Sequence, residues 1–259
     1  MKNLFKLIGI IAIVAVIGFS MIACNKSGGS SGSKSSGGVG KTLNSAEELK
    51  EYLDKQPVNG PDKPIKVSMT INNPMLKSVV DVLNSAGKYV SLNISGNALT
   101  TIPREAFYDR KTHKGCETLV SITIPNSVTE IGRDAFIDCS SLTNINIPNN
   151  ITEIWERTFA RTKITSITIP NSVTYIGTAA FSGCTSLTSI NIPNSVTGIE
   201  DYAFQYCTSL TSVTFQGTIS SDYFWSDNTF DGDLREKYLA EGIGTYTRQN
   251  GESYTWTKK

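Results

Sequence analysis

The stretch ITIPNSVT occurs at residues 122–129 and again, letter for letter, at residues 167–174. Two near copies lie between and after them, INIPNNIT at residues 145–152 and INIPNSVT at residues 190–197. A catalytic site needs its special residues only once. Four copies of one stretch therefore predict a repeating structure rather than a single reactive centre.

The repeat has a period of 22 or 23 residues. Phenylalanine recurs at one position of the copies, and leucine or isoleucine recurs at two others. The three series are Phe136, Phe159, Phe181 and Phe204; Leu119, Leu142, Ile164, Leu187 and Leu210; and Ile131, Ile154, Ile176 and Ile199. A period of this length with apolar residues at fixed positions is typical of a solenoid, whose coils bury their apolar sides against one another.

One copy predicts the path of the first part of a coil. β-Branched residues favour a strand in LVSITIP (residues 119–125), with Leu119, Ile122 and Ile124 pointing inward. Pro125 ends this strand because proline has no N–H to donate to a neighbouring strand. We expect the strands of successive coils to pair in parallel, about 4.7–4.9 Å apart.

The rest of the copy predicts two further segments. SVTEIG (residues 127–132) indicates a second short extended segment after a PNS turn. RDAFIDC (residues 133–139) indicates a tight helical turn that closes the coil. The residues of these segments that we expect inside are Val128, Ile131, Ala135, Phe136 and Cys139.

The pattern L-T-S-I-x-I-P-N-S-V-T-x-I-G-x-x-A-F-x-x-C-x-S resembles the BspA-like class of bacterial leucine-rich repeats, over residues 89–217 and about five coils. The resemblance implies an α/β repeat fold, a leucine-rich-repeat solenoid with a parallel β-sheet. Two copies depart from the pattern. A six-residue insertion, DRKTHK, follows the first copy (residues 92–107) before Cys116, and RTK replaces the cysteine-containing turn of the third.

Residues 41–88 are expected to cap the N-terminal end of the solenoid. Ser45 and Glu48 fit a capping box at the start of a helix. IKVSMTI (residues 65–71) predicts a strand, and Asn73 begins a second helix that leads to the first strand of the repeat, which together make a βαβ crossover. The apolar faces of the two helices carry Leu49, Tyr52 and Leu53, and Leu76, Val79, Val80 and Leu83.

Residues 218–259 are expected to cap the C-terminal end. Residues 231–241 predict a short helix. YTRQNGESYTW (residues 246–256) predicts a β-hairpin that turns at Asn250 and Gly251. This tail resembles the ends of related spirochete surface proteins.

The N-terminal segment predicts export. Two lysines precede an apolar run (residues 7–23) that ends in a small residue, as in secretory signal peptides. The sequence MIAC resembles the lipobox of bacterial lipoproteins, which implies lipid attachment at Cys24 after removal of residues 1–23. An uncleaved membrane anchor is the alternative, because 17 apolar residues are at the lower limit for spanning a bilayer.

Residues 24–40 predict a flexible tether. Glycine and serine supply 12 of the 16 residues after Cys24, so this segment cannot bury a core. Asn25 is not the aspartate that retains many lipoproteins at the inner membrane. We therefore expect anchorage in the outer membrane, facing the cell surface.

Charge and composition exclude several functions. The 24 basic and 23 acidic residues give no electrostatic support for nucleic-acid binding. His113 is the only histidine, so no serine-hydrolase, Cys–His or histidine–metal arrangement is available. Residues 226–238 are acidic but lack the spacing of a calcium loop, and they indicate an acidic helix start. We expect no enzyme activity, no cofactor, no metal and no small-molecule substrate.

Four cysteines, Cys116, Cys139, Cys184 and Cys207, occupy one position of successive coils. Two interpretations are open. Disulfides or a metal site fit an exported protein. Buried free thiols beneath the phenylalanine series fit the packing, and they agree better with four parallel side chains, which do not surround an ion.

The outward positions are candidates for binding. Those of the strands are polar and nearly uncharged: Ser121, Thr123, Asn144, Asn146, Ser166, Thr168, Ser189, Asn191, Ser212 and Thr214. Other positions hold glycine, glutamate or an aromatic residue in different copies, which a core position would not tolerate. They predict Trp155, Tyr175, Tyr202 and Tyr206 as exposed ligand-binding residues, since interface hot spots are rich in such side chains. The alternative is scattered aromatics that pack on the neighbouring coil.

The resemblance implies a lipid-anchored, adhesin-like surface protein that binds host matrix or plasma proteins, or other bacteria. The residues alone imply an exported, anchored protein with a large surface for protein–protein interaction. A structural or envelope-assembly lipoprotein that faces the periplasm and has no host ligand is the alternative.

Overall fold

The structure is a computed structural model that describes residues 42–224, 226 and 228–259. The predicted signal peptide, lipid-attachment residue and tether therefore lie outside the described residues. Among the described residues, no helix is both long enough and apolar enough to cross a membrane.

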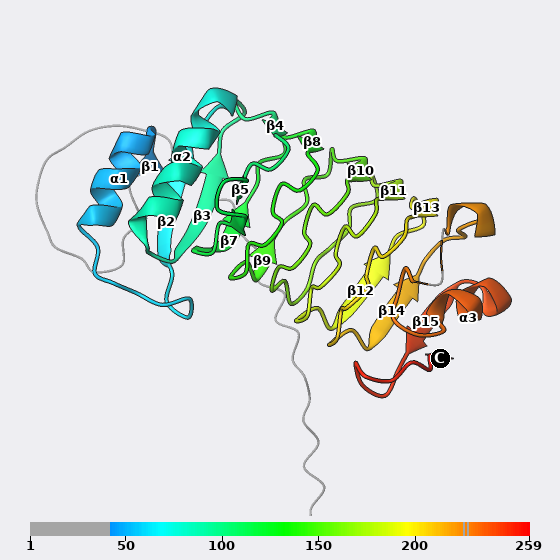
Figure 1. Cartoon of the computed structure of the whole chain (residues 1–259). Helices are drawn as coiled ribbons and strands as arrows, with labels where there is room; N and C mark the ends of the chain where they lie inside the picture. The colour runs from blue at the N-terminus through cyan, green and yellow to red at the C-terminus, as the bar shows by residue number, and fades with distance from the viewer. Residues whose placement is uncertain (1–41, 225, 227) are drawn as a thin grey trace, which may run out of the picture. The chain divides into compact units, whose positions relative to one another are not determined.

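The N-terminal part is a parallel sheet with two helices packed together beside it (Figure 1). Its elements are β1 (Thr42–Leu43), α1 (Ala46–Asp54), β2 (Ile65–Thr70), α2 (Asn73–Ala86) and β3 (Val90–Ser95). The strands β1, β2 and β3 pair in parallel in that order. Helix α2 ends at Gly87, whose φ of 59° is the left-handed conformation that glycine adopts without strain. The residues that α2 buries are Leu76, Val79, Val80 and Leu83.

Helix α1 begins as the sequence predicts but differs in detail. The Ser45 hydroxyl oxygen accepts the Glu48 N–H at 3.1 Å. The Glu48 carboxylate accepts the N–H of Asn44 at 2.9 Å, so the second half of the capping box closes one residue earlier than expected. Tyr52, which the sequence placed on the apolar face, is exposed.

The coils carry two rows of short strands, which lie along the lower and upper edges of the stack in Figure 1. The first row continues from β3 through β7 (Leu119–Thr123) and β9 (Asn144–Ile145) and resumes at β12 (Ser189–Ile192) and β14 (Ser212–Phe215). The second row consists of β4 (Thr101–Ile102), β8 (Glu130–Ile131), β10 (Glu153–Ile154), β11 (Tyr175–Ile176) and β13 (Gly198–Ile199). Strand pairs within both rows are parallel, which confirms the predicted leucine-rich-repeat arrangement.

The first row is interrupted at the fourth coil, where the sequence predicted a continuous ladder. Residues 165–169 form no strand, and the Thr165 N–H reaches the Thr143 carbonyl at 3.3 Å. The turn that precedes this segment, from Phe159 to Ile164, is one residue shorter than the matching turn of the second coil. The backbone nevertheless stays in register there, because the Thr188 N–H of the next coil donates to the Thr165 carbonyl at 3.4 Å.

The turn that closes each coil is not helical, contrary to the prediction. Asp134 and Asp138 have φ values of 57° and 58°, which a right-handed helix does not allow. The Phe136 N–H donates to the Thr158 carbonyl of the next coil at 2.9 Å rather than to a carbonyl of its own turn. The equivalent left-handed positions of the coils hold Glu105, Asp134, Asp138, Arg157, Arg161, Ala179, Gly183, Tyr202 and Tyr206.

A column of stacked phenylalanine rings runs through the core. Neighbouring ring centroids lie 4.7–5.8 Å apart, and the ring planes are within 22° of parallel. The column contains the predicted series and one further ring at each end: Phe107, Phe136, Phe159, Phe181, Phe204 and Phe230.

The additional ring of Phe230 shows that a further coil extends beyond residue 217. Phe224 pairs with Ile199 in a parallel bridge, and the Thr229 carbonyl accepts the N–H of Phe204 at 2.8 Å, as the preceding coils do for one another. The sequence predicts a cap here because the PNSVT and A-F-x-x-C parts of the pattern do not recur after residue 217, although the first strand recurs at residues 210–215.

The C-terminal elements are η1 (Ser221–Tyr223), α3 (Leu234–Glu241), β15 (Gly244–Thr247) and β16 (Thr257–Lys258). Helix α3 starts three residues later than predicted. The helix start is acidic as expected, with Asp233 at the N-cap and Glu236 in the first turn, but no side chain caps it. Asp231 accepts the N–H of Tyr206 at 3.1 Å and Asp233 accepts that of Trp256 at 2.7 Å. These carboxylates fasten the end of the chain to the fifth coil.

The terminal hairpin is wider than the predicted tight turn. β14 pairs with β15 and β15 with β16, both antiparallel, and residues 248–256 connect the last two strands. A turn does form at Asn250, whose side chain accepts the Ser253 N–H at 2.9 Å. Gly251 touches the fifth coil so closely that an added Cβ would lie 1.2 Å from the Thr208 carbonyl oxygen.

Arg248 closes the last coil. Its guanidinium donates to the carbonyls of Leu210 at 2.5 Å, Cys207 at 3.1 Å and Ser253 at 3.1 Å, and it lies 4.9 Å from the Trp256 ring centroid. Its exposed fraction is only 7 %, and this burial lowers the pKa of Arg248. The Arg248 backbone N–H donates to the Thr211 carbonyl at 3.1 Å, as the Thr211 N–H does to the Thr188 carbonyl one coil earlier, so Arg248 takes the place of a following coil.

Candidate binding surfaces

Two of the four predicted aromatic residues are not exposed as expected. Trp155 and Tyr175 are half-buried. The guanidinium of Arg133 lies 5.6 Å from the Trp155 ring centroid. The Tyr175 ring covers Gly198 of the next coil, and its hydroxyl donates to the carboxylate of Glu200. The exposure prediction is wrong for this pair because both side chains pack along the coils.

Tyr202 and Tyr206 are exposed as predicted, by 41 % and 61 %. Both have a φ of 60°, in the left-handed region. One coil earlier, Ala179 and Gly183 occupy the same two positions. The fold therefore accepts small residues at the points where this coil presents two tyrosines.

At the same two positions of earlier coils, charged side chains pair with each other. Asp134 binds Arg157 at 2.7 Å, and Asp138 binds Arg161 at 2.5 Å. Asp134 is nearly buried, and its hydrogen bond raises the pKa of Arg157. The surface of the turns thus changes from ion pairs in the second and third coils to tyrosines in the fifth.

The polar strand face is a second candidate, and part of it is occupied by contacts within the protein. The Asn146 side chain accepts the Ile124 N–H at 2.7 Å and donates to the Ile124 carbonyl at 2.8 Å. At the interruption of the first row, an opening of about 250 Å³ lies between residues 144–149 and 166–170. Its lining combines amide and hydroxyl side chains with Ile145, Ile147, Ile167 and Pro170, and holds no charged side chain.

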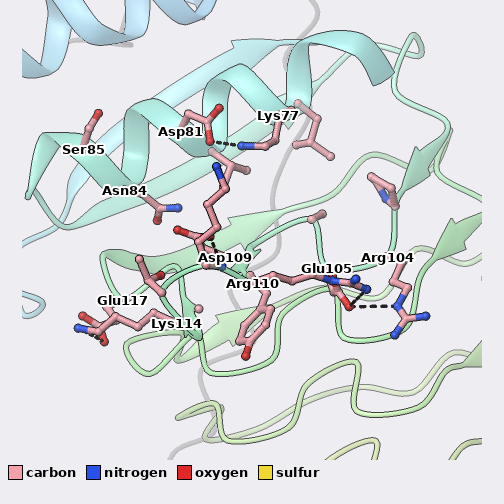
Figure 2. Close-up of a pocket in the computed structure, with 18 of the residues that line it drawn as sticks. Lys77, Asp81, Asn84, Ser85, Arg104, Glu105, Asp109, Arg110, Lys114 and Glu117 are labelled. Carbon is pink, nitrogen blue, oxygen red and sulfur yellow. Dashed lines mark hydrogen bonds and ion pairs between the residues drawn. The ribbon is translucent and has the colours of Figure 1, made fainter.

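A groove of about 980 Å³ lies between α2 and the first coil (Figure 2). Hydrogen bonds join the two walls at both ends. The Asn73 side chain donates to the Thr100 hydroxyl at 2.8 Å and accepts the Thr100 N–H at 2.9 Å. The Thr118 hydroxyl donates to the Leu83 carbonyl at 3.1 Å. Helix α2 therefore cannot close onto the coil to fill the space.

The second wall of the groove includes the insertion after the first copy. It forms an antiparallel hairpin of β5 (Tyr108–Asp109) and β6 (Lys114–Gly115). His113 lies at its tip, exposed, with Nδ1 3.5 Å from the Tyr108 hydroxyl. The sequence revealed the insertion but not the groove, because α2 and the hairpin meet only in the folded chain.

The four cysteines are buried free thiols, in agreement with the packing interpretation. Cys184 and Cys207 each donate to the carbonyl of the phenylalanine one coil earlier, at 3.2 Å in both cases. Thr162 fills the same position in the third coil and contacts the Cys184 sulfur at 3.3 Å. Burial raises the pKa of Cys184 to about 11. No group of potential metal ligands occurs among the described residues.

The two strand rows and the repeated buried positions define a leucine-rich-repeat protein. The family model of the BspA type leucine rich repeat region matches residues 100–232 in 6 copies. This match spans about half of the chain, and the chain belongs to the BspA-type leucine-rich-repeat family.

Three solved structures illustrate the similarity. A leucine-rich repeat protein from Bacteroides ovatus is 36 % identical over 48 % of this chain and 33 % of its own, with a TM-score of 0.41. The T. pallidum leucine rich repeat protein is 30 % identical over 61 % and 67 %, with a TM-score of 0.45. The pneumococcal vaccine antigen PcpA is 21 % identical over 61 % and 42 %, with a TM-score of 0.40. The chain thus spans about a third of the B. ovatus protein, and a comparison with curated proteins finds no match.

Proposed function

We propose that the protein is a lipid-anchored, adhesin-like binding protein that carries its repeats at the cell surface and attaches to a protein of a host or of another bacterium. The segment that ends at Cys24 and the tether of residues 24–40 support the anchor. The repeat fold supports protein–protein interaction, because solenoids offer extended surfaces for a partner.

The observation that carries this proposal is the exposed pair Tyr202 and Tyr206 on left-handed turns. This conformation costs a residue other than glycine about 1–2 kcal/mol, and Ala179 and Gly183 show that folding needs no aromatic ring there. Neither tyrosine hydroxyl has a hydrogen-bond partner among the described residues. Tyrosines bury much area at low entropic cost, which suits them to be interface hot spots.

A double variant, Tyr202→Ala with Tyr206→Gly, tests the proposal. Each new residue is the one that the fourth coil already has at that position, so the fold should tolerate the change. We expect the full-length protein to lose about 2 kcal/mol of binding energy, roughly 30-fold in affinity, toward whichever matrix or plasma protein of a test panel binds the parent. Asn191→Ser on the strand face is the control. If only the control variant lost binding, the binding site would lie on the strand face and not at the two tyrosines.

Protease treatment of intact cells tests the location. Display at the cell surface predicts that added protease degrades the repeats without permeabilisation. Protection until the outer membrane is opened would favour the alternative, a structural or envelope-assembly lipoprotein facing the periplasm.

A further inference from the structure

The β5–β6 hairpin is an element that the repeat does not need. Cys116 lies nine positions after Phe107, whereas Cys139 lies three positions after Phe136. Without residues 109–114 the first coil would read FYGC, close to the FSGC of the fourth coil. The side chains from Arg110 to Lys114 are exposed, so the insertion adds nothing to the core. Ordering it costs conformational entropy, which points to a role outside folding.

The hairpin is held rigidly at its base. The Cys116 N–H donates to the Phe107 carbonyl at 2.8 Å across the base. Gly115 touches the backbone of the second coil, since an added Cβ would lie 2.2 Å from the Asp138 carbonyl carbon. These contacts hold the base of the hairpin against the coils, so that the hairpin forms the wall of the groove opposite α2.

The groove displays charges of both signs, and most of them are already paired. Figure 2 shows Lys77 bonded to Asp81 along α2, and Arg110 directed toward Glu105. Lys114 also lies 3.5 Å from a carboxylate, that of Glu117. The full charged lining consists of Lys77, Arg104, Arg110, Lys111 and Lys114, and of Asp81, Glu105, Asp109 and Glu117.

Two lining groups are left available for a ligand. Among the described residues, Lys111 of the exposed hairpin has no carboxylate at ion-pair distance. The Asn84 side chain points from α2 into the groove (Figure 2) and makes no hydrogen bond with another described residue. A lysine binds a carboxylate, and an amide both donates to and accepts from a peptide backbone.

We propose that the groove binds an extended segment of a partner polypeptide, with an acidic side chain of that segment paired to Lys111. A polypeptide can match both signs of charge along the groove and offers backbone groups to Asn84. A nucleic acid would place its phosphates against four carboxylates. An apolar helix would displace water from the ion pairs without offering hydrogen bonds in place of that water. The volume, about 980 Å³, is at the upper end of ordinary ligand pockets and suits a short peptide segment.

This inference rests on the proposed role in protein binding and adds a second site, separate in the chain from Tyr202 and Tyr206. It is tested with phage-displayed random peptides selected on the full-length protein. They are counter-selected on a variant in which residues 109–114 are deleted and Tyr108 is joined to Gly115. We expect peptides that bind the parent and not the deletion variant, and we expect those peptides to contain Asp or Glu.

Charge reversal then tests the contact. Lys111→Glu should weaken a selected peptide about tenfold or more, and replacing the acidic residue of the peptide by lysine should restore binding to that variant. Lys163→Glu, a change of another exposed lysine outside the groove, is the matched control and should have no effect.

The inference is overturned if no peptide distinguishes the parent from the deletion variant, or if Lys111→Glu and Lys163→Glu behave alike. Its failure is distinguishable from failure of the proposed function. The double variant at Tyr202 and Tyr206 should keep peptide binding intact, while the deletion variant should keep the attachment that depends on those tyrosines.

Discussion

Gly198 and Tyr175 form one packing unit although they belong to different coils. An added Cβ at Gly198 would lie 3.0 Å from the Tyr175 ring. Burial, followed by the hydrogen bond to Glu200, raises the pKa of Tyr175. For Glu200, burial acts to raise the pKa, but hydrogen bonds from Thr178 and Tyr175 outweigh it and the pKa is lowered. The residue type at such a position is therefore set by the side chain that packs on it from the neighbouring coil. A change of residue between copies does not mean that the position faces solvent.

The buried thiols predict a defined pH dependence of stability. Burial raises the pKa of Cys184 from 9.0 to about 11, so the folded state holds this proton more tightly than the unfolded state. The contribution to stability is fully present below pH 9 and is lost as the pH rises toward 11. We expect Cys184 to account for a loss of roughly 2–3 kcal/mol in the free energy of unfolding over this range.

Cys184→Thr isolates that effect, because Thr162 shows that the position accepts threonine. Urea unfolding at pH 7 should give similar stabilities for parent and variant, and the parent should lose more stability by pH 11. Equal pH dependence in both proteins would contradict the assignment. In the native parent at pH 8, a thiol reagent should leave the four repeat cysteines unmodified until denaturant is added.

At the scale of elements, the phenylalanine column joins the coils. Phe181 is fully buried between Phe159 and Phe204, with ring centroids 5.3 and 5.1 Å away. Phe181→Ala should lower the free energy of unfolding by about 3–5 kcal/mol, because the coils on both sides prevent collapse of the cavity. Tyr254→Ala, at a highly exposed ring, should change it by less than about 0.5 kcal/mol. A cost below about 1 kcal/mol at Phe181 in urea unfolding would show that the column does not carry the stability.

The C-terminal hairpin depends on Arg248 in a comparable way. Arg248→Met keeps much of the side-chain volume but removes the guanidinium that donates to three carbonyl groups. We expect a loss of about 3 kcal/mol, since hydrogen bonds from a charged donor contribute about 1.5–3 kcal/mol each and part of the lost bonding is regained with water. Amide hydrogen exchange should rise first in β14 and β15. Lys163→Met, at an exposed lysine, is the control, and an equal effect there would contradict a capping role.

At the scale of the whole molecule, the sequence predicts what is repeated and misses what is made by contact between different segments. Constant apolar positions predicted the coils and the phenylalanine column. The left-handed turns are hard to predict because Arg157 and Tyr202, unlike glycine or aspartate, rarely adopt a positive φ. The groove was missed because its walls are far apart in the chain. Trp155 and Tyr175 are half-buried although their positions vary between copies, because a variable side chain can still pack along the neighbouring coil.

Cys24, which lies outside the described residues, is predicted to attach the chain to a membrane. If Cys24 is the lipidated residue, the mature protein should lack residues 1–23, carry covalently bound fatty acid and partition into detergent. More than one acyl chain gives stable anchoring, which a single chain does not. Cys24→Ser should leave the precursor uncleaved and should incorporate no labelled palmitate. Cys184→Thr, which alters a buried cysteine of the repeats, should change neither property. A parent protein that retains residues 1–23 and takes up no fatty acid would instead identify residues 7–23 as an uncleaved membrane anchor, because the apolar run alone would then hold the chain at the bilayer.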